Sequence, residues 1–190
     1  MLQLYVLLKD RKLNRLAGFD YSKNGWYFVT ICTKYKGNVL GEITDKFMEL
    51  NELGKIVKDQ WLWLENRFDY LKYDEWIIMP DHIHGIMVID NYIVGNGRDG
   101  DEIIVGNGRD GNEIVGNGRD RSVQENKIKS ISELVGAFKT TSSKNIHNLG
   151  YPNFQWHKSF YDEIIRDEKS LERIRKYIIE NPDNFLKSKL

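Results

Sequence analysis

The feature that most constrains the fold is a nine-residue run at 79–87, M-P-D-H-I-H-G-I-M. It joins two apolar stretches at Pro80, W-I-I-M before it and I-M-V-I after it, so we expect strands over 75–79 and 84–89. Because side chains alternate faces along a strand, the imidazoles of His82 and His84 should point to the same side. Two neutral imidazoles at this spacing form half of a metal site. The pair alone fits two ordinary strand histidines equally well.

Hydrophobic periodicity and capping signals predict three further elements in the first two thirds of the chain. Aromatic and β-branched residues at 25–33 are typical of a strand. Apolar residues recur with helical spacing from Leu50 to Leu64, which predicts an amphipathic helix. Ser130 and Glu133 form a capping box ahead of another apolar stripe, so we expect a second helix to begin there.

The C-terminal part adds a strand and a last helix. We expect the strand over 160–166, and a helix capped by Asp167 that runs through Glu180 and stops at Pro182. The resulting order is β, α, β, β, α, β, α. This order predicts an α+β fold in which helices pack on one face of an antiparallel sheet.

Composition indicates one globular domain over residues 1–190, with 41% hydrophobic and 12% aromatic residues. The single cysteine, Cys32, excludes an intramolecular disulfide framework and fits a reducing cytoplasm. No apolar run approaches the roughly 20 residues that a membrane span needs, so we expect no membrane partner. We therefore expect a cytoplasmic protein.

A glycine-rich repeat interrupts the domain. The heptapeptide I-V-G-N-G-R-D occurs at 93–99, 104–110 and 114–120, and its turn-forming residues predict a surface loop inserted at about 91–126. Calcium binding is disfavoured, because the glycine–aspartate repeats that bind calcium have a strict nine-residue period.

Charge is balanced overall but unevenly distributed. The net charge of zero argues mildly against a nucleic-acid partner. However, residues 121–158 carry six basic and two acidic side chains, and residues 90–120 carry seven acids against three arginines. Solvated surface remains the simplest explanation for any one of these runs.

A second chemical feature lies in the predicted last helix. Tyr177 and Asn181 are four residues apart in Y-I-I-E-N-P and therefore share a helical face. An activated tyrosine hydroxyl is a covalent nucleophile, and a carboxamide oxygen could complete a metal site begun by two histidines. Taken alone, a tyrosine at the edge of the core and a C-terminal helix asparagine are the simpler interpretation.

Four motifs together carry a family resemblance. They are G-F-D-Y-S-K-N-G-W-Y-F-V-T-I-C-T, M-P-D-H-I-H-G-I-M, F-Q-W-H-K-S-F-Y-D-E-I-I-R-D-E and Y-I-I-E-N-P. In this order they resemble the single-tyrosine HUH transposases, most closely the REP-associated branch. The resemblance implies a ferredoxin-like HUH nuclease fold with the catalytic tyrosine on the C-terminal helix. It places the histidine–hydrophobic–histidine motif on His82 and His84, the nucleophile on Tyr177, and a metal-holding polar residue on Asn181.

The resemblance also implies a function. It predicts a metal-dependent endonuclease and strand transferase that uses Mg²⁺ or Mn²⁺ and acts on single-stranded or hairpin DNA through a 5′-phosphotyrosine. Such an enzyme would work in the cytoplasm at the nucleoid, as a monomer or homodimer. Tyr161 is a competing nucleophile. The alternatives are a non-cleaving hairpin-binding protein and an unrelated metal-dependent hydrolase that activates water.

Binding to a DNA strand requires basic side chains for phosphates and aromatic platforms for bases. The candidates for phosphate contact are Arg11, Lys12, Arg15, Lys139, Lys144 and Lys158. Trp156 is the candidate for base stacking.

Overall fold

The computed structural model describes residue 16, residues 18–90 and residues 128–187. The glycine-rich repeat and the basic residues Arg11, Lys12 and Arg15 lie outside these described residues.

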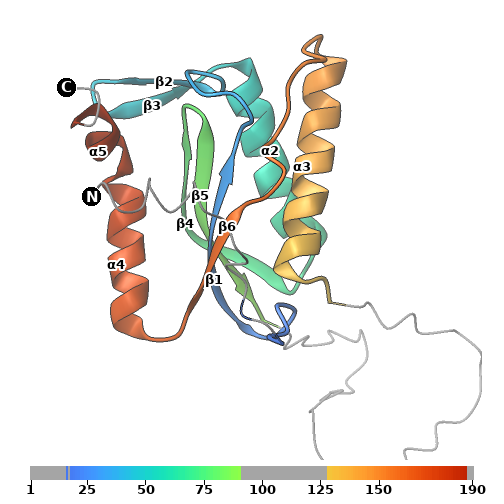
Figure 1. Cartoon of the computed structure of the whole chain (residues 1–190), viewed down its shortest axis with the longest axis vertical. Helices are drawn as coiled ribbons and strands as arrows, with labels where there is room; N and C mark the ends of the chain where they lie inside the picture. Colours follow the sequence, from blue (N-terminus) through green and yellow to red (C-terminus); the bar gives the residue numbers. More distant parts are fainter. Residues whose placement is uncertain (1–15, 17, 91–127, 188–190) are drawn as a thin grey trace, which may run out of the picture.

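A four-stranded antiparallel sheet forms the centre of the fold (Figure 1). Its strands are β1 (Gly25–Cys32), β4 (Leu71–Met79), β5 (His82–Ile89) and β6 (Tyr161–Ile165), in the order β4-β5-β1-β6. The central strands β1 and β5 pair along their whole length, so that Cys32 lies opposite His82 and Thr30 opposite His84. A separate two-stranded hairpin, β2 (Gly41–Thr44) and β3 (Phe47–Leu50), follows β1.

Local capping explains where the three longer helices begin. Asn51 accepts a hydrogen bond from the Gly54 amide at the start of α2 (Glu52–Arg67). The predicted Ser130–Glu133 capping box is present at the start of α3 (Ile131–Asn148). Asp167 caps α4 (Glu168–Ile179), as the sequence predicts.

The predicted helix ends where the sequence indicates, but a further element follows it. Helix α4 ends at Ile179 with Glu180 as its C-cap, and a short helix, α5 (Asn181–Lys187), which contains Pro182, follows directly. Proline fits the first turn of a helix, where its missing N–H has no intrahelical acceptor.

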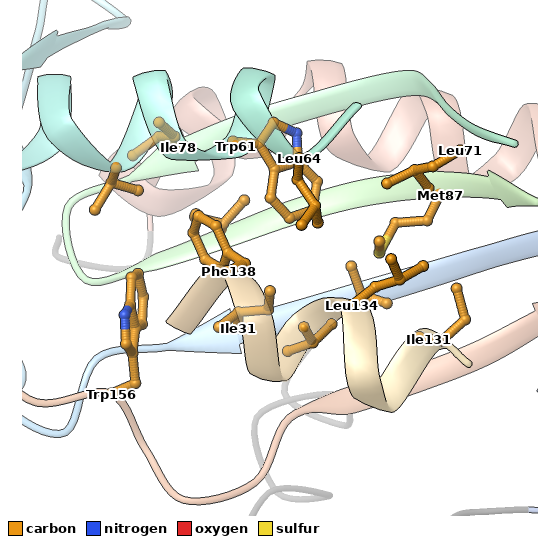
Figure 2. Close-up of a cluster of buried hydrophobic side chains, with 14 of the residues drawn as sticks. Ile31, Trp61, Leu64, Leu71, Ile78, Met87, Ile131, Leu134, Phe138 and Trp156 are labelled. Atoms are coloured by element: carbon orange, nitrogen blue, oxygen red, sulfur yellow. The ribbon is translucent and has the colours of Figure 1, made fainter. Parts of the chain in front are cut away.

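The main core lies between the sheet and the helix pair α2 and α3 (Figure 2). Trp61, Leu64, Leu134 and Phe138 project from these helices onto the sheet. Gly85 of β5 permits this close packing, because a Cβ atom at that position would lie 2.7 Å from the Trp61 ring. The glycine of the H-I-H-G run therefore seats a tryptophan directly beneath the histidine-bearing strand.

Helix α4 covers the opposite face of the sheet (Figure 1). Its buried residues Leu171, Ile174 and Ile178 pack on Phe28 and Ile86, which alternate along their strands with residues of the main core. The α+β fold with an antiparallel sheet is thus confirmed, but the helices cover both faces rather than one. The reason is that β1 and β5 are apolar on both sides, as strands buried on both faces are. No helix in the described part of the chain is both long enough and apolar enough to cross a membrane.

Candidate active site

The two strand histidines converge on the face of the sheet that α4 covers. Alternation along β5 places His82 and His84 on the side of Ile86, as predicted. Their Nε2 atoms are 3.0 Å apart. His84 is buried and stacks on the Phe28 ring, with 5.6 Å between ring centroids, whereas His82 is partly exposed. The pair therefore presents two ring nitrogens to one point.

The opposite ring nitrogens are held by neighbouring side chains. His82 Nδ1 lies 2.6 Å from Asp81 Oδ1, and His84 Nδ1 lies 2.9 Å from Thr30 Oγ1 on the adjacent strand. Because a carboxylate only accepts, His82 Nδ1 carries a proton and donates it to Asp81. The Thr30 hydroxyl can donate as well as accept, so it can partner Nδ1 in either tautomer of His84. Such outer partners orient histidines that bind metals.

Electrostatics favours a neutral His84 and a charged Asp81. Burial, together with the neighbouring His82, holds the pKa of His84 well below its ordinary value. Burial opposes ionisation of Asp81, but the hydrogen bond to His82 and the nearby Lys36 hold the pKa of this carboxyl below its usual value. His84 therefore carries a neutral imidazole, and Asp81 is a carboxylate.

Tyr177 reaches the histidine pair from α4. Its hydroxyl is 3.3 Å from His84 Nε2, and the two rings meet edge to face with centroids 5.2 Å apart. Burial raises the pKa of Tyr177, and a hydrogen bond with the Asn181 side chain partly offsets this. The hydroxyl therefore keeps its proton at neutral pH, and a nearby positive charge would make it a better nucleophile.

Asn181 contacts Tyr177 although the two belong to different helices. It is the first residue of α5 and is buried. The spacing of four residues still brings the side chains together, because Glu180 at the junction keeps a right-handed helical backbone conformation. The site thus contains all four residues that the sequence nominated.

The donors at this site fit a small divalent ion. Two nitrogen ligands of a tetrahedral ion at ~2.0–2.1 Å lie roughly 3.3 Å apart, close to the 3.0 Å between the two Nε2 atoms. The described residues contain no group of three histidine, cysteine or acidic side chains arranged to hold a metal. The Asn181 carboxamide lies next to the histidine pair through its hydrogen bond with Tyr177.

Tyr161, the competing nucleophile, faces a different environment. Its hydroxyl donates to Glu163 Oε2 at 3.2 Å. Burial, with the negative charge of Glu163, raises the pKa of Tyr161 to about 12. Of the two tyrosines, it is Tyr177 that hydrogen-bonds to the histidine pair.

The predicted DNA-binding residues divide into two groups. Lys144 and Lys158 are exposed and available for phosphate contact. Lys139 is engaged within the fold, since its Nζ donates to the carbonyls of His157 and Ser159. The prediction that Trp156 stacks on a base is wrong. Only 8% of this residue is exposed, its Nε1 donates to Ser142 Oγ, and it belongs to the main core (Figure 2). A buried ring offers no face to a base.

Sequence reasoning missed three residues that support the site. Asp81 and Thr30 orient the histidines, and Arg175 fixes the helix that carries Tyr177. Arg175 donates from Nε and Nη2 to the two carboxylate oxygens of Asp74 on β4, at 2.7 and 2.8 Å. Only Asp81 had a sequence signal, its place directly before His82; the other contacts join residues far apart in the chain.

A sequence relative establishes the family. The chain is 31% identical over 175 residues to a Haemophilus influenzae protein described as uncharacterized, covering 92% of this chain and 89% of that protein. The chain belongs to the family of this protein. No family model matches the chain.

Two solved structures resemble the structure of this chain. One is a REP-associated tyrosine transposase bound to a REP hairpin, with a TM-score of 0.57 and 16% identity over 93% of this chain and 74% of that chain. The other is a candidate transposase from Deinococcus radiodurans R1, with a TM-score of 0.45 and 17% identity over 90% of this chain and 98% of that chain. The family member thus has the fold of the REP-associated tyrosine transposase, as the resemblance predicted.

Proposed function

We propose that the protein is a metal-dependent endonuclease and strand transferase that acts on single-stranded or hairpin DNA through a covalent 5′-phosphotyrosine. One observation carries this proposal: the Tyr177 hydroxyl lies 3.3 Å from His84 Nε2, beside His82, in a fold shared with a tyrosine transposase. A nucleophile and a pair of nitrogen ligands thus face the same point.

The chemistry follows from the placement of the nucleophile. Tyr177 attacks the scissile phosphorus, a Tyr–O–P bond forms, and the bond from phosphorus to the 3′ oxygen breaks. The phenol loses one proton and the departing 3′ oxygen gains one, so the step consumes neither water nor a nucleotide cofactor. The product is a 5′-phosphotyrosine and a free 3′-hydroxyl. The reverse step onto another 3′-hydroxyl rejoins DNA, because the covalent bond retains the phosphodiester energy.

His82, His84 and Asn181 would hold the divalent ion. When bound, the ion supplies the positive charge that neutralises the charge developing on the scissile phosphate. Asp81 and Thr30 would hold the two imidazoles in place for it. We propose Mg²⁺ or Mn²⁺, and imidazole ligands favour Mn²⁺ of the two.

The proposal extends to the setting of the enzyme. It would act on DNA of the cytoplasm at the nucleoid, as a monomer or a homodimer. Lys144 and Lys158 are exposed in the described part of the chain and would contact phosphates.

A metal-site variant tests the proposal. The full chain is mixed with end-labelled single-stranded hairpin DNA and Mn²⁺, and the products are separated on a denaturing gel. The wild type should give a protein–DNA band that survives denaturation. His82→Ala should lose this band but keep hairpin binding, because phosphate contacts lie elsewhere.

The same gel separates the alternatives. A non-cleaving hairpin-binding protein would shift the DNA on a native gel but give no covalent band. A hydrolase that activates water would give cut DNA without the band. An adduct that forms at the wild-type rate in His82→Ala would rule out the proposed metal site.

A further inference from the structure

A pocket lies just beyond the end of β1. It has a volume of about 320 Å³, which is at the small end of ligand-binding clefts. Its walls are mainly apolar or aromatic and include Tyr35, Val39, Tyr151, Pro152 and Phe154. Tyr35 and Tyr151 are 54% and 47% exposed. The molecule thus leaves two tyrosine rings accessible at the edge of one hollow.

The pocket is joined to the proposed active site by two short contacts. Thr33, which lines the pocket, donates from its amide to the Asp81 carbonyl at 2.8 Å. The Asp81 carboxylate in turn holds His82 Nδ1 at 2.6 Å. Through Thr33 and Asp81 the pocket therefore adjoins the histidine pair.

The pocket walls are rigidly held. The chain after β1 pairs with the segment before β6: Thr33 bridges to Trp156, and the Lys34 amide donates to the Gln155 carbonyl at 2.8 Å. On the far wall, the Tyr151 amide donates to the carbonyl of Ile146 in α3. The tyrosines are thus presented by a fixed backbone, which limits the ordering entropy that a ligand must overcome.

Charge around the pocket favours an anionic partner. Two lysines flank Tyr35 in the chain: Lys34 Nζ donates to Gln155 Oε1 of the pocket at 2.7 Å, and Lys36 Nζ lies 3.3 Å from Asp81 Oδ2. Lys34 Nζ lies 5.4 Å from the Tyr35 ring centroid, so a cation stands beside the aromatic face.

We propose that this pocket binds an unpaired base of the DNA strand next to the cleavage site, with Tyr35 and Tyr151 as stacking platforms. The inference rests on the proposed function for its choice of partner. Exposed aromatic rings beside lysines form the pattern by which proteins hold single strands, because every base has a π face and every nucleotide a phosphate. Tyr35 and Tyr151 thus replace the buried Trp156 as the candidates for base stacking.

Binding without cleavage tests the proposal. Fluorescein-labelled (dT)20 is titrated with the full chain in EDTA, and fluorescence anisotropy gives Kd. Tyr35→Ala and Tyr151→Ala should each raise Kd by about 5- to 100-fold, the range for loss of one stacked base. Tyr35→Phe keeps the ring and should bind like the wild type.

A matched control uses another exposed aromatic residue. Trp63 is 38% exposed and lies ten residues along α2 from the pocket residue Leu53, about 15 Å away. Trp63→Ala should leave Kd unchanged. A strand of the same length with abasic nucleotides should bind the wild type and Tyr35→Ala equally, since it has no bases to stack.

Three outcomes would overturn the proposal. The first is wild-type affinity for (dT)20 in both tyrosine-to-alanine variants. The second is an equal loss of affinity for the abasic strand, which would indicate that the rings act otherwise than by stacking. The third is light scattering that shows a dimer for the wild type and a monomer for Tyr35→Ala. This result would indicate that the pocket binds a second copy of the chain. Binding in EDTA requires neither the ion nor Tyr177, so failure of the cleavage proposal would leave this result standing.

Discussion

Replacement of Thr30 by valine should loosen His84 without changing the shape of the core. Thr30 is 7% exposed and lies opposite His84 in the pairing of β1 with β5. Its hydroxyl is 2.9 Å from His84 Nδ1, and valine replaces that hydroxyl by a methyl group of similar size. The ring nitrogen then stays buried without this partner.

The magnitude follows from the geometry. Leaving a buried polar atom unsatisfied costs about 1–3 kcal/mol. For a chain of this length, each kcal/mol lowers Tm by about 2–4 °C, so Tm should fall by roughly 2–12 °C. Loss of an outer partner typically weakens metal binding about 10- to 100-fold, and titration calorimetry with Mn²⁺ should find that loss.

Matched variants isolate the hydroxyl. Thr30→Ser restores the oxygen and should recover most of the Mn²⁺ affinity. Thr44→Val makes the same chemical change at an exposed strand position and should change neither Tm nor affinity. Wild-type Mn²⁺ affinity and stability in Thr30→Val would refute the idea that this hydroxyl orients His84.

Three further predictions concern the scaffold. Gly85→Ala should lower the free energy of unfolding in urea by about 1–3 kcal/mol, because the added Cβ meets the Trp61 ring at 2.7 Å; unchanged stability would show that Trp61 moves freely. Hydrogen bonds from Arg175 hold the pKa of Asp74 below 3.8, so this pair should stabilise the fold above that pH and lose its effect as the pH falls below it. In Asp74→Asn, the free energy of unfolding should therefore fall less steeply at acid pH than in the wild type, and an identical pH dependence would contradict this. A short Gly-Ser linker in place of residues 93–120 should preserve Tm, whereas a large drop would mean that the repeat packs on the core.

Local signals in the sequence predicted the elements but not how they assemble. The capping box at Ser130 and the Asp167 cap define helix starts, because each depends on atoms a few residues apart. The apolar stripe of α4 predicted a buried face, but a stripe does not say which side of a sheet it covers. Only the double-sided apolar character of β1 and β5 carried that information.

The catalytic candidates were predictable for a similar reason. The strand period relates His82 to His84, and the helix period relates Tyr177 to Asn181, so each pair is fixed locally. Their meeting rests on tertiary contacts 93 residues apart in the chain, which periodicity alone does not give. Trp156 was wrongly taken for a stacking platform because aromatic character does not distinguish a buried ring from an exposed one.

The identity of the covalently linked residue tests the central claim most directly. Labelled hairpin DNA is incubated with the full chain and Mn²⁺, the adduct is digested with protease and nuclease, and mass spectrometry locates the attached nucleotide. The nucleotide should be found on Tyr177; Tyr177→Phe should abolish the adduct without lowering Tm appreciably, and Tyr161→Phe should retain it. An adduct on Tyr161, or one that persists in Tyr177→Phe, would contradict the assignment of Tyr177 as the nucleophile.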